Sequence, residues 1–485
     1  MRTALAVILT LWIGTSVDAY DQELWTHYTS QNVVTSIAEG ESEIYFGTSG
    51  GVRRYHRFRQ AWLRPITTAD GLPDNFVRQM GYDRNTGDLI IETRTGSARW
   101  MSNMEALTPG VFTELNPYNR IPTIPHSIVP PFGYYINGDI IRGPRRTYRI
   151  LDAHVDSWNV LWLATNGLGI GKADLTFNQL EFLQSGPEVS NVTALEFDGD
   201  DLWVGARDDI TAYARGISRY DRRNETWTYY MSDEIPRLDD TQVADILADS
   251  TNVWFATEQG IVRYRKEEDA WDTYLYRRSQ SARHVRNTMS LARGAGRLWL
   301  GTLEGLAVLD LGADTLRAVG GSRDFRINDL ASGTNHIWAA THRGLFRCTI
   351  DSVTWTPVRD VSAATRPVLA VTTSGDSTWA LASSPPVLLV SAHPDSAWRS
   401  IELPEAAGSD RAAMSVSGKR LWIGTKNGIV RVNTRSGNTD SMNAIDGLLD
   451  DWVHDLRLDG QDVWIATRGG LSLYRWGDDF RDPED

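Results

Sequence analysis

The residues with the clearest chemical potential occupy the variable positions of a repeated turn. The turn has the approximate pattern Thr-x-x-Gly, and its variable positions hold a different polar or charged side chain in each copy. We predict that these residues line a binding face, because packing fixes the scaffold of a repeat while its turns are free to differ. Solvated turns that bind nothing are the alternative. The predicted residues are Arg94, Asn166, Arg207, Glu258, Glu304, His342, Lys426 and Arg468.

Two basic segments add a second kind of candidate. A guanidinium group can hold a carboxylate or a phosphate through two parallel hydrogen bonds. Either segment could therefore bind an anion on this acidic protein, and a solvated basic loop is the alternative. The first segment, "YRRSQSARHVRN", contributes Arg277, Arg278, Arg283 and Arg286, with His284 between them. The second contains Arg142, Arg145, Arg146 and Arg149.

Catalytic and metal-binding patterns are scarce. The nine histidines form no HExxH motif and no closely spaced ligand pair, and there is no Gly-x-Ser-x-Gly motif. "GLGIGK" at residues 167–172 superficially resembles a phosphate-binding loop, but it opens no helix, so we expect a turn and a strand. Acidic turns such as "DGDD" at residues 198–201 match no EF-hand, and hairpin turns favour the same residues. The sequence predicts no catalytic residue, no metal site and no cofactor.

A repeat of about one propeller blade positions these residues. An aromatic or apolar marker, usually the Trp of "LWIGT", occurs at positions 45, 90, 162, 203, 254, 299, 338, 379, 422 and 464. Most steps are 39 to 51 residues, which suits a four-stranded blade. One step of 72 residues contains a proline-rich stretch, so we assign residues 101–148 to an irregular insertion with room for a hairpin in "GYYINGDIIRG". The fold class predicted is an all-β propeller of four-stranded antiparallel blades, with about ten repeats.

The last repeat has three strand-like segments, and the missing fourth resembles a segment near the other end. "LWTHYTS" is similar to the fourth strands of other repeats. We predict that residues 24–29 pair with residues 471–476 and close the ring, which removes exposed sheet edges. One ring of about ten blades is the simplest arrangement. Two smaller rings, or a distorted ring with one or two poorly formed blades, are the alternatives.

The repeats resemble a known family. "DGLPDNFVRQMGYDRNTGDLIIETRTG" and "DGLLDDWVHDLRLDGQDVWIATRGGLSLY" look like two-component regulator propeller repeats. In that family such propellers form the periplasmic sensor region of hybrid histidine kinases, and a similar propeller occurs in a component of the type IX secretion machinery. The sequence shows no kinase or receiver region. The resemblance implies the propeller fold, an exported location and a tendency to bind ligands or partners.

Composition sets the expected location and partners. The net charge of −13 argues against nucleic acid and anionic membranes as partners. Residues 1–19 have the pattern of a cleavable signal peptide without a lipobox cysteine, so we expect a periplasmic or secreted protein without a membrane span, composed of residues 20–485. Cys348 is the only cysteine, which rules out an intramolecular disulfide and suggests a packed strand thiol.

These observations predict a non-enzymatic β-propeller of the bacterial cell envelope. It would act as a ligand-binding, sensor-like module or as a protein-interaction scaffold, as a monomer, with an envelope protein, a glycan or a peptide as partner. A propeller-type polysaccharide lyase or glycoside hydrolase is the alternative. A glycosidase needs two carboxylates roughly 5 to 10 Å apart in a cleft. Such a pair at the ring mouth would favour the enzyme, and a basic or aromatic mouth would favour the binding module.

Overall fold

The computed structural model describes residues 24–111, 124–144, 146–207, 216–230, 235, 242–275, 285–322, 325–350, 354–359 and 361–476. These residues form 42 strands in ten antiparallel sheets, nine of four strands and one of six. The helical elements among them are short 3₁₀ turns: η2 (Thr68–Asp70), η4 (Ser362–Thr365), η5 (Pro404–Ala406) and η6 (Ala444–Asp446). The predicted all-β class and the ten repeats are confirmed. The predicted signal peptide at residues 1–19 lies outside the described residues.

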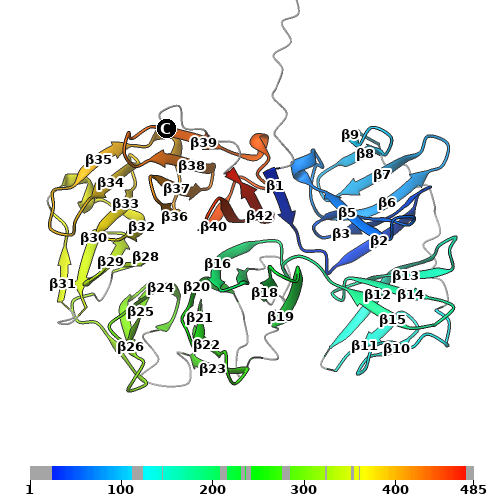
Figure 1. Cartoon of the computed structure of the whole chain (residues 1–485), viewed down its shortest axis with the longest axis horizontal. Coiled ribbons are helices and arrows are strands. Elements are labelled where there is room, and N and C mark those ends of the chain that lie inside the picture. Colours follow the sequence, from blue (N-terminus) through cyan, green and yellow to red (C-terminus); the bar gives the residue numbers. More distant parts are fainter. Residues whose placement is uncertain are drawn as a thin grey trace, which may run out of the picture.

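Seven sheets are arranged as the blades of a ring (Figure 1). The innermost strands contact one another in sequence order, and the last of them contacts the first. These strands are β16 (Val192–Asp198), β20 (Val243–Ala248), β24 (Thr288–Gly294), β28 (Ile327–Ser332), β32 (Val368–Ser374), β36 (Ala413–Ser417) and β40 (Val453–Asp459). Each contains both buried and partly exposed residues, as expected where the strand packs against its blade and also lines a channel.

Each blade continues outward through three more antiparallel strands. The second strands, which carry the marker residue, are β17 (Asp201–Ala206), β21 (Asn252–Thr257), β25 (Arg297–Thr302), β29 (His336–Thr341), β33 (Ser377–Ala382), β37 (Arg420–Thr425) and β41 (Asp462–Thr467). The third are β18 (Ile217–Asp221), β22 (Gly260–Arg265), β26 (Gly305–Asp310), β30 (Gly344–Thr349), β34 (Val387–Ser391), β38 (Gly428–Asn433) and β42 (Gly470–Arg475). The fourth are β19 (Thr226–Tyr230), β23 (Ala270–Leu275), β27 (Thr315–Ala318), β31 (Thr354–Pro357), β35 (Arg399–Glu402) and β39 (Thr439–Met442).

The seventh blade takes its fourth strand from the start of the described chain. Strand β1 (Trp25–Tyr28) pairs with β42, with Trp25 opposite Tyr474 and Tyr28 opposite Leu471. This is the strand pairing that the sequence predicted. The tryptophan of the same blade then packs on the first blade of the ring, because Trp464 shares a core cluster with Val204 and Tyr220.

The other three sheets do not belong to the ring. They form a row beside it, which we call the arm (Figure 1). One blade is β2 (Val34–Glu39), β3 (Glu43–Thr48), β4 (Gly51–His56) and β5 (Ala61–Ile66). The next is β6 (Val77–Asp83), β7 (Asp88–Thr93), β8 (Ser97–Met101) and β9 (Ala106–Pro109). The third is the six-stranded sheet of β10 (Tyr135–Asn137), β11 (Ile140–Arg142), β12 (Thr147–Val155), β13 (Val160–Thr165), β14 (Ile170–Asp174) and β15 (Leu180–Leu183).

The prediction of a single ring of ten blades is therefore wrong. The order of the blades within the arm differs from their order in the sequence. The β2–β5 blade is in the middle, since β2 contacts both β6 and β12. Trp162 of the third blade packs against Phe46 of the middle blade, with ring centroids 5.2 Å apart. The step of 72 residues thus carries the chain from one side of the middle blade to the other. Within it, β10 and β11 form the hairpin expected in the insertion.

Both ends of the arm are closed without a further blade. At one end the marker position holds Ile90, and the exposed face of that blade carries polar pairs such as Gln79 with Glu92 at 2.7 Å. At the other end part of the insertion packs on the sheet, where Ile128 and Ile141 join a cluster with Leu163. Repeat arrays need such atypical end units, because an unpaired apolar face would remain in water.

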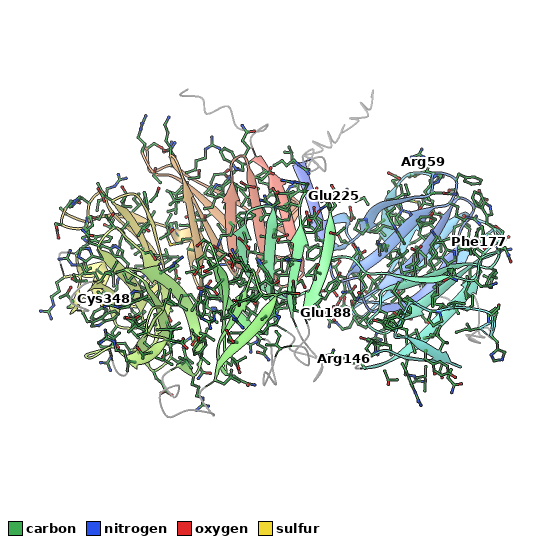
Figure 2. All side chains as sticks on the ribbon, turned by 60° about the horizontal axis from the view of Figure 1, so that its bottom comes forward. Arg59, Arg146, Phe177, Glu188, Glu225 and Cys348 are labelled. Carbon is green, nitrogen blue, oxygen red and sulfur yellow. The ribbon has the colours of Figure 1, made fainter. Side chains whose placement is uncertain are left out.

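Two crossing segments join the arm to the ring. Residues 29–33 lead from β1 into the arm, and residues 184–191 lead back to β16; Glu188 lies at this junction in Figure 2. The Asn32 side-chain amide donates to Glu188 at 2.9 Å, and the Gln31 amide donates to the Ser185 carbonyl at 3.2 Å. The segments approach so closely that a Cβ at Gly186 would lie 1.8 Å from the Thr29 carbonyl oxygen.

The remaining expectation about the core concerns Cys348. It is fully buried in the cluster that joins two ring blades, beside Ile337 and Trp299. Burial raises the pKa of its thiol to about 11, so the thiolate that would react is disfavoured. The packed strand thiol is confirmed. "GLGIGK" is likewise a turn followed by a strand, with Gly167 and Gly169 at positive φ.

Candidate functional site

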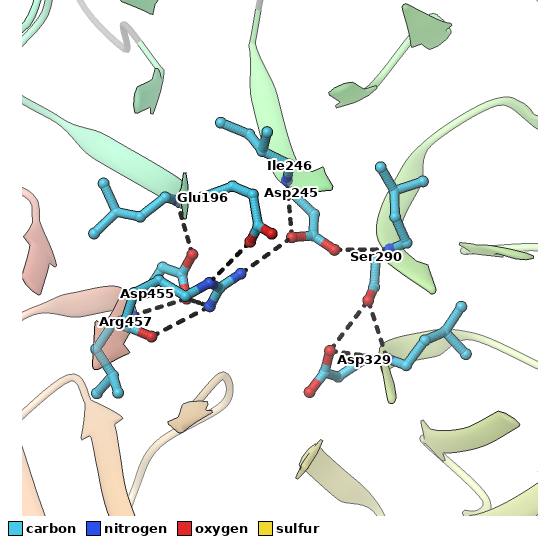
Figure 3. A network of polar contacts seen from close by, with 11 residues as sticks. Glu196, Asp245, Ile246, Ser290, Asp329, Asp455 and Arg457 are labelled. Atoms are coloured by element: carbon cyan, nitrogen blue, oxygen red, sulfur yellow. Dashed lines mark hydrogen bonds and ion pairs between the residues drawn. The ribbon is translucent and has the colours of Figure 1, made fainter. Parts of the chain in front are cut away.

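A cavity of about 510 Å³ runs through the centre of the ring. It is lined by the inner strands and is markedly polar, with Glu196, Asp245, Asp329, Asp455 and Arg457 among its lining residues. Figure 3 shows these side chains pointing toward one another from different blades. Because the cavity is enclosed by the blades and lined by several charged side chains, we take it as the candidate site.

Three aspartates form a repeated clamp between neighbouring blades. Asp455 accepts the amide of Leu456 in its own strand and the amide of Leu195 in the next blade, both at 2.8 Å. Asp245 does the same with Ile246 at 2.8 Å and Leu291 at 2.7 Å. Each of these carboxylates therefore has both oxygens occupied by backbone donors, and each holds two blades together.

Asp329 and its arm counterpart complete the pattern. Asp329 accepts the amides of Leu330 and Val371 at 2.8 and 2.9 Å, and also the Ser290 hydroxyl at 3.1 Å. Asp152 in the arm accepts the Ile37 amide of the middle blade at 2.9 Å. Every one of these aspartates follows a β-bulge in its strand, which turns the side chain toward the next blade.

Arg457 balances the negative charge on one side of the cavity. Its guanidinium contacts Asp455 at 2.6 Å, Glu196 at 3.2 Å and Asp245 at 3.9 Å (Figure 3). Burial alone would lower its pKa, but the three carboxylates raise it, so Arg457 stays charged. Burial raises the pKa of Asp245 to about 8 and that of Asp329 to about 6. These ionisations are therefore coupled to the packing of the blades.

The mouth of the cavity differs in charge from its interior. In an antiparallel blade the Thr-x-x-Gly turn and the start of the inner strand lie at the same end. Arg326 directly precedes β28, Arg411 lies two residues before β36, and Arg207 directly follows β17, so all three are at this end. Arg326 and Arg411 line the cavity. Partial removal from water by the surrounding protein lowers the pKa of Arg411, and the positive charges of Arg207 and Arg326 lower it further. The mouth is basic.

Arg411 also breaks the packing rule of the repeat. We call the inner-strand residue that pairs with the end of the second strand the entry residue. It is apolar or Thr wherever the structure shows this pairing: Val34, Val77, Ile150, Val192, Val243, Thr288, Ile327, Val368 and Val453. Arg411, two residues before Ala413, takes the corresponding place in its blade.

The preceding blade is altered at the matching position. Entry residues fit against a small residue of the blade before them, since a Cβ on Gly205, Gly301 or Gly424 would lie 2.4 to 2.6 Å from the entry side chain of the next blade. The blade before Arg411 has Leu381 at this position, fully buried in a cluster with Met414 and Leu421. Leu381 fills the space that an apolar entry residue would occupy, and Arg411 is left to face the cavity.

The structure divides the eight predicted turn residues between two bodies. Arg207, Glu258, Glu304, His342, Lys426 and Arg468 lie on one face of the ring, whereas Arg94 and Asn166 belong to the arm. Two of the arginines have carboxylate partners in their own blade: Arg94 pairs with Asp74 and Arg468 with Asp450, each at 3.0 Å. The imidazole of His342 accepts the Arg326 amide at 3.0 Å.

The two basic segments have different outcomes. Arg277, Arg278 and Arg283 lie outside the described residues, and only Arg286 of that set is described. In the second segment Arg149 pairs with Asp139 at 2.9 Å, and Arg145 lies outside the described residues. Anion binding by these segments stays a prediction.

Sequence reasoning missed the cavity residues themselves. The signal was present, because Asp152, Asp245, Asp329 and Asp455 each stand two residues after the entry residue. Arg411 could have been found by aligning the entry positions. Among the described residues no group of three or more His, Cys, Asp or Glu is arranged to hold a metal ion.

No family model matches the chain, and no curated protein sequence matches it. Several solved structures are similar. The extracellular domain of the one component system BT4673 from B. thetaiotaomicron is 14% identical over 91% of this chain and 70% of that chain, with a TM-score of 0.47. The extracellular domain of the hybrid two component system BT3049 from the same organism is 17% identical over 91% of this chain and 61% of that chain, with a TM-score of 0.49.

A third similar structure is PorZ, a bacterial surface component of the type-IX secretion system of Porphyromonas gingivalis. It is 11% identical over 93% of this chain and 87% of that chain, with a TM-score of 0.35. Both kinds of protein that the repeat motif suggested are thus among the similar structures. At these identities and TM-scores the likeness carries no inference about ligand or activity, and the fold assignment rests on the strand pairing and blade packing described above.

Proposed function

We propose that the protein is an exported β-propeller that acts as a binding module of the cell envelope, either sensor-like or as an interaction scaffold. Its ligand or partner, a glycan, a peptide or an envelope protein, would bind the ring face that carries the Thr-x-x-Gly turns. In this proposal residues 1–19 are a signal peptide, the mature chain is residues 20–485, and the mature protein is a monomer.

One observation carries the proposal: the ring has a basic mouth above a polar cavity. Arg207, Arg326 and Arg411 gather at this end, where the variable turn residues of the ring blades also lie. The blades beneath are held by buried tryptophans and aspartate clamps, so the scaffold is rigid while its rim varies. A preformed concave site with a few polar groups is the usual form of a ligand site.

The carboxylates of the cavity favour a binding module over a glycoside hydrolase. A catalytic carboxylate must be free to donate or accept a proton, or to attack the sugar. Asp245 and Asp455 use both oxygens to accept backbone amides, and Glu196 is paired with Arg457. Their arrangement is explained by blade packing, and the mouth above them is basic.

The proposed location is the periplasm or the cell exterior. Within the described part of the chain, no helix has the length and apolar character needed to cross a bilayer. Export itself is tested by expressing the full-length chain in a Gram-negative host and sequencing the N-terminus of the periplasmic product. Cleavage before Tyr20 supports the proposal, and retention of residues 1–19 on a cytoplasmic product contradicts it.

Binding is tested by thermal shift of the mature protein against panels of sugars, acidic sugars and peptides. A ligand that binds the folded state raises Tm by mass action. We expect a Tm rise that is lost in His342→Ala with Lys426→Ala on the ring face, and kept in Arg435→Gln, because the turn between a third and a fourth strand lies on the opposite face. Release of new sugar ends from a polysaccharide, abolished in Asp245→Asn, would instead establish the enzyme.

A further inference from the structure

We infer that the mouth of the ring is a binding site for an oxyanion, a carboxylate, sulfate or phosphate carried on a small hydroxylated ligand such as an acidic sugar. Arg411 and Arg326 would hold the anionic group, and the polar cavity would take the hydroxylated part. This inference rests on the proposed function and deepens it by naming the chemistry of the ligand.

Blade packing does not require an arginine at position 411. Its counterparts in the ring, such as Val243, Ile327 and Val453, are buried residues that fit against a small residue of the preceding blade. At this one junction Leu381 fills the space and the entry position is an exposed arginine lining the cavity. A residue that departs from the packing pattern of its repeat, with a compensating change in the neighbouring blade, is typical of a functional position.

The Arg411 and Arg326 side chains have no direct carboxylate contact within the described part of the chain. Neither side chain makes a hydrogen bond or an ion pair there, and the charges of Arg207 and Arg326 act on Arg411. The nearby carboxylates Asp410 and Asp329 offset part of this charge, although Asp410 is exposed and the oxygens of Asp329 accept the Leu330 and Val371 amides. Two guanidinium groups without a direct carboxylate contact favour an external anion.

His342 lies at the same end of the ring. Its Nδ1 accepts the Arg326 backbone amide at 3.0 Å, so the neutral ring carries its proton on Nε2. This hydrogen bond fixes the imidazole against the segment that contains Arg326. His342 is exposed, so its Nε2–H is available as a donor on this face of the ring.

The cavity below the arginines selects the rest of the ligand. Its volume of about 510 Å³ lies within the range of small-molecule sites. The polar lining groups include Asn328 beside the mouth, and Thr372 and Ser415 farther along the inner strands. The carboxylates deeper in the channel repel a second anion, so an anion is held at the mouth and a neutral hydroxylated body is accepted beneath it. A uronic acid or a sugar phosphate has this division of charge.

The test is isothermal titration calorimetry of the mature protein, in a buffer free of phosphate and sulfate, with inorganic phosphate, D-glucuronate and D-glucose as probes. We expect both anions to bind, glucuronate more tightly than phosphate, and glucose to bind weakly or not at all. Loss of one charged hydrogen-bond partner should weaken binding by roughly tenfold to a hundredfold in Arg411→Gln and in Arg326→Gln. Arg411→Lys keeps the charge and should retain part of the affinity.

Arg435→Gln is the matched control. It removes the same charge from an exposed turn on the opposite face, so its affinities should equal those of the wild type. If Arg411→Gln fails to fold, Arg326→Gln, which lies outside the blade packing, carries the same test. Wild-type protein that binds neither anion at millimolar concentration overturns the inference, and so does Arg411→Gln or Arg326→Gln, folded, with unchanged affinity.

Failure of the inference can be told apart from failure of the proposed function. A peptide or neutral sugar whose binding is lost in His342→Ala with Lys426→Ala, but not in Arg411→Gln, removes the anion site and leaves the binding module. Absence of any ligand in the thermal-shift panels, together with no anion binding, removes both.

Discussion

The phenolic hydroxyls of Tyr28 and Tyr220 lie 3.3 Å apart, although 192 residues separate them in the chain. Tyr28 belongs to β1, which completes the seventh blade, and Tyr220 belongs to the first blade of the ring. Tyr28 also stacks on Trp464 with ring centroids 5.7 Å apart. The joint between the last and the first blade is thus an aromatic cluster supplied by three distant segments.

Substitution of Trp25 should strongly destabilise the seventh blade, which β1 completes. Trp25 is buried against Tyr474, with centroids 4.6 Å apart, and loss of a buried aromatic side chain costs roughly 3 to 5 kcal/mol. We expect Trp25→Ala to lower Tm markedly in a thermal melt. Phe177→Ala is the control, because Phe177 is 74% exposed and should change the free energy of unfolding by less than about 0.5 kcal/mol. Equal Tm values for the two variants would contradict closure by β1.

Acid should weaken the pairing of β1 with β42 through His27. The His27 Nδ1 lies 3.0 Å from the Ser472 hydroxyl, and burial, followed by the charge of Arg64, lowers the pKa of His27 to about 3. The unfolded chain therefore binds this proton more readily than the folded chain. The neutral His27 imidazole contributes fully to the free energy of unfolding above about pH 6.5, which is the pKa of histidine in an unfolded chain. This contribution is lost as the pH falls toward about 3.

We expect His27→Asn to reduce the acid sensitivity. Its Tm should fall less than the wild-type Tm between pH 6.5 and pH 4, because the buried group that must remain neutral is gone. Carboxylates elsewhere titrate in both proteins, so the difference between the two melting curves is the measurement. A difference that does not change with pH would show that His27 contributes nothing to the acid response.

Substitutions at the marker positions of the two outer arm blades should reduce the free energy of unfolding by different amounts. Trp162 packs on Phe46 and Tyr55 of the middle blade, whereas Ile90 faces no further blade. Trp162→Ala should cost roughly 3 to 5 kcal/mol, partly through the lost hydrogen bond from its indole to Asp156. Ile90→Ala should cost less than about 1.5 kcal/mol. Urea unfolding of both variants tests the order of the blades, and a large cost at Ile90 would imply an unrecognised partner surface.

The crossing of the two linking segments makes Gly186 a sensitive position. Its φ is 75°, and an added Cβ would meet the Thr29 carbonyl. Gly199 has a similar φ of 63° with open space around it. Gly199→Ala should therefore cost only the strain of the left-handed conformation, roughly 1 to 2 kcal/mol. Gly186→Ala should cost clearly more, and equal denaturation midpoints would mean that the segments do not cross as described.

The repeat period was enough to predict the blades, because each blade is a local antiparallel unit. "LWIGT" at residues 421–425 indeed lies in β37, and the strand that pairs with β42 was identified from its similarity to other fourth strands. The sequence also contained the reason why the ring has fewer than ten blades. Ile90 replaces the tryptophan, and Glu92 stands where the other blades have Gly, Ala or, in one ring blade, Leu381, as expected for a blade with nothing stacked on it.

The site was harder to predict than the blades. The direction of Asp245 or Asp455 depends on a β-bulge, which a periodic pattern does not reveal. The role of Arg411 depends on Leu381, thirty residues away in the neighbouring blade, so neither residue is informative alone. The predicted turn residues share a face only within the ring, because two of them belong to the arm, and their part in binding is still a prediction.

The position of β1 also sets an order of events during synthesis. His27 and Ser472 are 445 residues apart, so β1 is synthesised long before its partner β42. The residues between them must all be synthesised before the seventh blade can be completed. Because long-range pairing is slow and leaves strand edges open, assembly of this ring is a late, all-or-none step. A truncation that removes β42 would leave β1 without the strand with which it pairs.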